Sequence, residues 1–176
     1  MELGLAIIGL AASIGIGLIL LLSAVDKLRH RALLPGVIAN YRLLPPALVA
    51  PAALLLPVAE LLIGGALVAW LAPLPVVLAI GLLLMFTAAI AINIARGRSH
   101  IDCGCGRSQL RHSIGWPLVG RNMILALLLA PRLWPVPPLS AIDMGTAIAG
   151  GLAIALAYPL YTAIAALIAS PAAYRR

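Results

Sequence analysis

The sequence is poor in charged residues, in aromatic residues and in cysteine, and the first two shortages each exclude a class of protein. Charged residues make up 10% of the 176 residues, and the mean hydropathy is +1.14. A soluble domain of this size cannot cover so much apolar surface with so few charges, so lipid is the expected solvent. The chain has one phenylalanine and no basic stripe interleaved with aromatics, so its net charge of +7 does not indicate nucleic-acid binding. Cationic loops facing an anionic membrane leaflet explain this charge.

Long uncharged runs predict an all-α, polytopic membrane bundle of about five transmembrane helices, in a single domain over residues 1–176. The first run lacks the basic leading region of a signal peptide and is longer than its apolar core, so we expect it to be a retained helix. Ser13 and Gly17 within it form a small-xxx-small pair that favours close helix packing. The fourth run is marginal, because Arg121 lies inside it. The predicted spans are residues 3–25, 47–71, 75–95, 114–133 and 144–170.

The stretch 26–46 mixes basic and apolar residues, which predicts a partly helical, amphipathic segment lying in the membrane interface. Its apolar side chains are expected to enter the lipid, while its basic head groups, including that of Lys27, stay in water. Pro35-Gly36 is expected to break this segment.

The basic residues predict the sidedness of the chain. Ten of the twelve Lys and Arg residues fall on one side of a five-span arrangement, in the first loop, in the loop 96–113 and at the C-terminus. The opposite side has Arg132 alone. By the positive-inside rule, the loop 96–113 is cytoplasmic and the N-terminus lies outside, in a bacterial cytoplasmic (inner) membrane.

The loop 96–113 holds both cysteines of the chain, Cys103 and Cys105, separated by one glycine. Gly104 supplies the backbone freedom that so small a disulfide ring requires, and the ring is expected to be strained. A strained, exposed disulfide exchanges readily, which suits thiol–disulfide chemistry more than a structural role. Four arginines in the loop favour the thiolate, while Asp102 disfavours it slightly. The loop is therefore predicted to be a redox loop.

Two other interpretations of the cysteines stay open. A metal site would combine them with His100 and His112, although structural zinc sites usually space their cysteines by two to four residues. Alternatively, the two cysteines have no chemical role in a tight glycine turn. The favoured interpretation is a redox pair without a metal.

Polar residues inside the predicted spans form a second candidate set. Glu60 lies about 13 residues into the second span, roughly 20 Å deep, where a carboxylate is costly and needs a partner. Arg121 is the expected ionic partner, with Asn93 and Asn122 as hydrogen-bonding alternatives. A structural clamp and a role in proton handling or cofactor binding are both open interpretations.

Six short motifs carry a resemblance to known families. Residues 23–28 (SAVDKL), 41–45 (YRLLP) and 57–65 (PVAELLIGG) resemble the DoxX-like membrane proteins, which implies a four-helix core plus one helix. A second group of motifs looks more specifically like the methylamine utilisation protein MauE family. It consists of residues 93–98 (NIARGR), 101–106 (IDCGCG) and 116–122 (WPLVGRN).

The resemblance implies a role in maturing a disulfide-rich client, as in biogenesis of the methylamine dehydrogenase beta subunit, beside a thioredoxin-like partner. It implies that Cys103 and Cys105 are the redox pair, with Glu60, Arg121 and Asn122 in support. A quinone is the one cofactor that the resemblance suggests, and the only feature of the sequence that supports a quinone site is an apolar surrounding near an arginine. Membrane lipid is the other expected partner.

Two points stay open at the level of sequence. Disulfide-rich dehydrogenase subunits mature in the periplasm, whereas the charges place the cysteine loop in the cytoplasm. A thiol–disulfide oxidoreductase also has two competitors. One is a non-catalytic membrane scaffold or chaperone, and the other is a small-solute or metal carrier that uses Glu60 and the Cys/His loop.

Overall fold

A computed structural model describes the backbone of residues 2–98 and 114–169, and the side chains of residues 3–98 and 114–164. All regular secondary structure in these residues is helical, as the sequence predicts. The elements are α1 (Glu2–Arg29), α2 (Leu34–Asn40), α3 (Pro46–Val68), α4 (Leu74–Ala95), α5 (Trp116–Leu129), the 3-10 helix η1 (Ala130–Leu133) and α6 (Ala141–Ala169).

Four of the helices, α1, α3, α4 and α6, are long and apolar enough to cross a membrane. They correspond to four of the five predicted spans. Helix α5 has 14 residues and is therefore about 21 Å long, which is less than the roughly 30 Å of a bilayer core. It continues directly into η1, so the predicted span 114–133 is helical from Trp116 to Leu133 but is not a single long α-helix.

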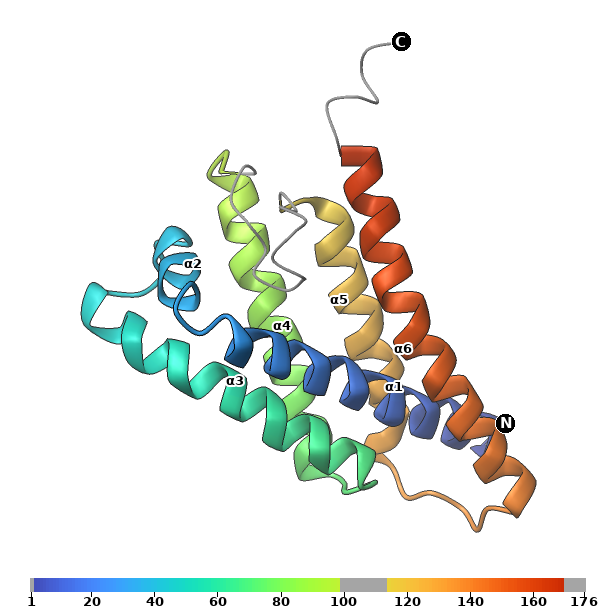
Figure 1. The fold of residues 1–176 in the computed structure, drawn as a ribbon. Helices are drawn as coiled ribbons and strands as arrows, with labels where there is room; N and C mark the ends of the chain where they lie inside the picture. The colour runs from blue at the N-terminus through green and yellow to red at the C-terminus, as the bar shows by residue number, and fades with distance from the viewer. Residues whose placement is uncertain (1, 99–113, 170–176) are drawn as a thin grey trace.

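Helix α1 is the central element of the bundle. It packs against α3 along one side and against α6 along another, while α4 packs against α5 (Figure 1). Glycine allows the closest of these approaches. A Cβ atom on Gly17 would lie 2.8 Å from the carbonyl oxygen of Gly64, and one on Gly151 would lie 2.6 Å from Ile14 Cβ. The predicted close packing at Gly17 is confirmed, with α3 as the neighbour.

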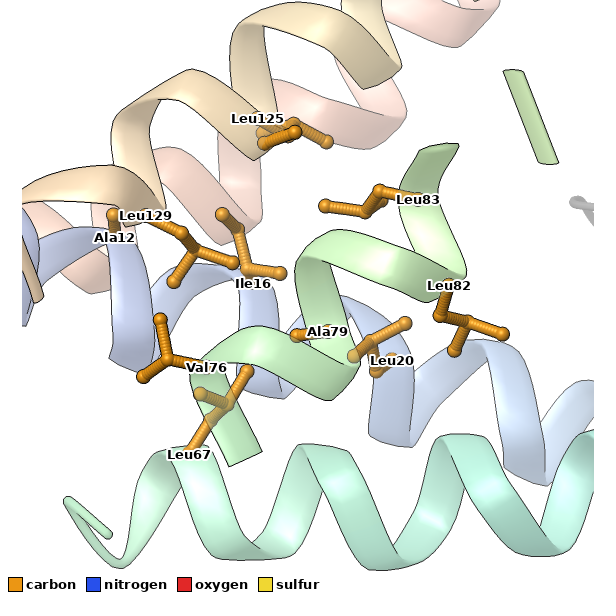
Figure 2. Close-up of a cluster of buried hydrophobic side chains, with 11 residues drawn as sticks. Ala12, Ile16, Leu20, Leu67, Val76, Ala79, Leu82, Leu83, Leu125 and Leu129 are labelled. Atoms are coloured by element: carbon orange, nitrogen blue, oxygen red, sulfur yellow. The ribbon is translucent and has the colours of Figure 1, made fainter. Parts of the chain in front are cut away.

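The apolar core lies where α1, α3, α4 and α5 meet. Figure 2 shows side chains from all four helices pointing toward one another, among them Ile16, Leu67, Val76 and Leu129. All four of these side chains are completely buried. Large apolar side chains on the outside of the bundle are widely exposed, as expected for a surface that faces lipid.

Hydrogen bonds between distant segments show which helix ends lie together. At one end, Arg98 Nη2 donates to the carbonyl oxygen of Asn40 at 2.6 Å, which joins the end of α4 to the end of α2. At the other end, Arg132 Nη2 donates to the carbonyl oxygen of Trp70 at 2.8 Å, which joins η1 to the α3–α4 turn. The first loop and the start of the loop 96–113 therefore share one end of the bundle, as the five-span arrangement requires.

The stretch 26–46 differs from its prediction. Helix α1 continues through Arg29, so Lys27 belongs to this helix and is buried, not held in water. Pro35 does not break a helix but lies in the first turn of α2, where its fixed φ is favourable and its missing N–H is not needed. The predicted interfacial segment is thus the end of α1 followed by a separate short helix.

Candidate functional site

A buried ion pair joins α1 to α3. Lys27 Nζ donates to Glu60 Oε1 at 2.8 Å and to Oε2 at 2.9 Å, and it also donates to Ser23 Oγ at 2.5 Å. Ser23 Oγ in turn donates to Glu60 Oε1 at 3.3 Å. The side chains of Lys27 and Glu60 are exposed by only 6% and 1%. Because an ammonium group has three protons, these three acceptors occupy it fully.

The predicted pairing of Glu60 with Arg121 is wrong. Ser23 and Lys27 are four residues apart in α1, so both lie on the helix face that packs against α3. That face brings the ammonium group to Glu60, since α1 extends beyond the predicted end of the first span. The spacing of Ser23 and Lys27 indicates that they share a helix face, but the predicted first span ends at residue 25, which leaves Lys27 in water.

Arg121 lies in α5, is exposed by 8% and has no carboxylate partner among the described residues. Its Nε and Nη2 donate to Asn122 Oδ1 at 3.2 and 3.1 Å. The guanidinium carbon lies 4.5 Å from the centre of the Tyr158 ring of α6, a cation–π distance. Nη1 is buried and has no hydrogen-bond partner in the described part of the chain. Asn122, which the sequence offers as an alternative partner of Glu60, is a partner of Arg121 in the structure, and Tyr158 is a further partner that the sequence did not indicate.

Asn93 connects the end of α4 to the basic residues that follow it. Its side chain is completely buried, and its Nδ2 donates to the carbonyl oxygen of Ala89 at 3.0 Å. Its Oδ1 accepts a hydrogen bond from Arg98 Nη1 at 3.2 Å. Asn93 therefore orients Arg98, and its described side-chain hydrogen bonds do not include Glu60, so it belongs to the loop end of the bundle.

The predicted redox pair, Cys103 and Cys105, lies outside the described residues, as does Asp102. His100 and His112 of the alternative metal site lie outside them as well. Within the described ranges, no group of three or more His, Cys, Asp or Glu side chains is placed to hold a metal ion. The flanks of the loop are described. Polar groups are buried in both helices that bound it, at Asn93 in α4 and at Arg121 and Asn122 in α5.

A cavity of about 620 Å³ lies between the end of α1 and helices α2, α3 and α4. Its described lining is almost entirely apolar, and within it Lys27 and Tyr41 are the only residues that carry a polar side chain. The Lys27 ammonium group lies 5.8 Å from the centre of the Phe86 ring, which also lines the cavity. The buried ion pair therefore borders this cavity.

The sequence matches one protein family over most of its length. The family described as Methylamine utilisation protein MauE matches residues 5–135. The chain is 40% identical over 152 residues to a protein of Paracoccus denitrificans, covering 84% of this chain and 82% of the relative. It is 46% identical over 128 residues to one of Methylorubrum extorquens, covering 68% and 66%. A third, from Methylophilus methylotrophus, is 40% identical over 159 residues, covering 86% and 82%.

All three relatives carry the name Methylamine utilization protein MauE. No solved structure matches the chain. The family match agrees with the helices that are long and apolar enough to cross a membrane. The chain therefore belongs to the methylamine utilisation protein MauE family, a family involved in methylamine utilisation.

Proposed function

We propose that this protein supports methylamine utilisation by thiol–disulfide exchange, through Cys103 and Cys105, during maturation of a disulfide-rich client. The observation that carries the proposal is the Cys-Gly-Cys sequence in the loop between α4 and α5. Both helices that bound this loop bury polar side chains, and Arg121 carries a positive charge without a described carboxylate partner. A cation close to a cysteine favours its thiolate over its thiol.

The exchange consists of two balanced steps. A client thiolate attacks one sulfur of the Cys103–Cys105 disulfide, which forms a mixed disulfide and releases the other cysteine as a thiolate. A second client thiolate then attacks the client sulfur of this mixed disulfide, so that the client gains a disulfide and the pair is left reduced. A thioredoxin-like partner restores the pair by accepting its two electrons into a disulfide of its own.

The location that we propose is the bacterial inner membrane, with the N-terminus outside and the cysteine loop in the cytoplasm by the charge rule. The support is the clustering of ten of the twelve basic residues at one side. The hydrogen bond from Arg98 to Asn40 also holds the first loop and the start of the cysteine loop at one end of the bundle. A client that matures in the periplasm would need the pair to be accessible from the other side, and the thiol-blocking experiment below distinguishes the two arrangements.

Single substitutions, Cys103→Ser and Cys105→Ser, test the proposal in cells that make the client. We expect both variants to leave client thiols unpaired, measured by a gel shift after thiol trapping, while Ser108→Ala in the same loop leaves the client oxidised. Normal client disulfides in both cysteine variants, together with loss of those disulfides when the whole protein is deleted, would replace the proposal with a non-catalytic scaffold.

The orientation is tested separately by blocking thiols on intact cells with a membrane-impermeant reagent. Protection of Cys103 and Cys105 from this reagent, but not from a permeant one, is the expected result for a reduced pair in the cytoplasm. Reaction with the impermeant reagent would place the loop outside and contradict the charge rule for this chain.

A further inference from the structure

The apolar cavity between α1, α2, α3 and α4 opens on the surface of the bundle. Several of its lining residues are also exposed on the outside, with Leu55 at 63%, Met85 at 50% and Leu44 at 41%. Its volume of about 620 Å³ lies within the range of roughly 300–1,000 Å³ that is usual for small-molecule sites. Because the surrounding surface faces lipid, a membrane component can enter from the side.

The interior of the cavity offers few polar groups to a ligand. Among the described residues, Lys27 is the only charged lining residue, and all three of its ammonium protons already have acceptors in Ser23 and Glu60. Tyr41 is the only other described lining residue with a polar side chain. The cavity therefore suits a hydrocarbon chain better than a group that needs hydrogen bonds, such as the carbonyl ring of a quinone.

The positive charges lie at the rim of the cavity. Arg42 stands between two lining residues, Tyr41 and Leu43, and Arg96 follows the lining residue Ile92 by one helical turn. Arg96 Nη1 donates to the carbonyl oxygen of Arg42 at 3.4 Å. The segment between α2 and α3 therefore lies next to the end of α4.

Arg98 belongs to the same rim, because its guanidinium donates to the carbonyl oxygens of Asn40 and Tyr41. Arg42 and Arg96 are both exposed. None of the three arginines has a carboxylate partner among the described residues, where the ion pairs are Lys27–Glu60 and Asp26–His30. As far as the described residues go, no carboxylate neutralises the positive charge of this rim, which lies beside an apolar chamber.

We propose that this cavity is a binding site for one anionic phospholipid, with its acyl chains among α2, α3 and α4 and its phosphate at Arg42, Arg96 and Arg98. The division into an apolar interior and a cationic rim matches the division of such a lipid into tails and a charged head group. A basic residue near an anionic head group strengthens its binding about fivefold. A neutral lipid would gain nothing from the rim.

Native mass spectrometry of the full chain tests the site after reconstitution in nanodiscs of equal phosphatidylglycerol and phosphatidylcholine. We expect one retained lipid, predominantly phosphatidylglycerol. Arg42→Gln and Arg96→Gln should each lower the ratio of phosphatidylglycerol to phosphatidylcholine about fivefold. Arg31→Gln is the charge-matched control, because Arg31 is exposed and neither lines the cavity nor takes part in the rim hydrogen bonds.

A second pair of variants tests the chamber itself. Ala52 lines the cavity on α3, so Ala52→Phe should lower the retention of both lipids, whereas Ala50→Phe, on an exposed position that does not line it, should not. Equal losses in the two phenylalanine variants, or in Arg31→Gln and Arg42→Gln, would overturn the assignment. So would a wild-type ratio near one, retention of an isoprenoid quinone from bacterial membranes in place of phospholipid, or a lipid-free dimer.

Discussion

Two buried cations of this bundle, Lys27 in α1 and Arg121 in α5, are neutralised in different ways. Lys27 meets a carboxylate, that of Glu60, and all of its protons have acceptors. Arg121 is just as buried, yet its partners among the described residues are the Asn122 amide oxygen and the face of the Tyr158 ring, and its Nη1 has no hydrogen-bond partner there. The charge of Lys27 is neutralised by Glu60, whereas no described carboxylate neutralises the charge of Arg121.

The difference separates a structural role from a chemical one. A saturated, neutral pair has nothing left to offer a ligand, and it ties α1 to α3 beside the glycine contact between the same two helices. A cation without an anion is costly in a low-dielectric bundle, and such a cost is usually associated with function. Arg121 is therefore the better candidate to act on the cysteine loop, which ends shortly before α5.

Removing one partner of the Lys27–Glu60 pair is expected to have the largest effect. Lys27→Met leaves a buried carboxylate without a counter-ion and should lower the free energy of unfolding by about 3–5 kcal/mol. The measurement is an SDS titration in mixed micelles.

The double variant Lys27→Met/Glu60→Met serves as the control for this prediction. It replaces both charges by apolar groups of similar size and should recover most of the lost stability. A double variant that is less stable than Lys27→Met would mean that the pair does not act as a unit.

Forcing helices α1 and α3 apart is expected to have an intermediate effect on the free energy of unfolding. Gly17→Ala places a methyl group 2.8 Å from the Gly64 carbonyl oxygen, so the helices must move apart, at a cost of about 1–3 kcal/mol. Gly65→Ala is the matched control, because a Cβ atom there meets nothing within 4 Å. The same SDS titration compares the two variants, and equal unfolding free energies would show that the close approach carries no energetic weight.

Neutralising Arg121 should have the smallest effect on stability and a selective effect on chemistry. Arg121→Gln removes a cation that has no ionic partner among the described residues, so stability should stay within about 1 kcal/mol of the parent protein, unlike Lys27→Met. If its charge stabilises the thiolate of the cysteine pair, the rate of client oxidation should fall about tenfold, the effect of about 1.4 kcal/mol. Arg121→Lys, which keeps the charge, is the control, and a large stability loss without a change in rate would make Arg121 structural.

The two wrong predictions about the buried ion pair have different causes. Periodicity and hydropathy located four long helices within a few residues, because lipid demands long uncharged runs. The sequence predicts a solvated Lys27 because a charge after an apolar run normally marks the end of a span. It predicts a Glu60–Arg121 pair from charge alone, since sequence distance does not reveal which helix faces lie together.

The sequence alone determined that the protein is a membrane protein, that it is helical, and where its spans approximately lie. It also supplied the two residues proposed for redox chemistry, since all of these depend on composition and local spacing. Only the tertiary structure decided that Glu60 pairs with Lys27, that Arg121 has no carboxylate partner among the described residues, and that an apolar cavity ends at a cationic rim. The physical reason is that each of these is a relation between helices. Such relations depend on helix rotation and contact, which here are governed by glycines that let α1 approach α3 and α6 closely.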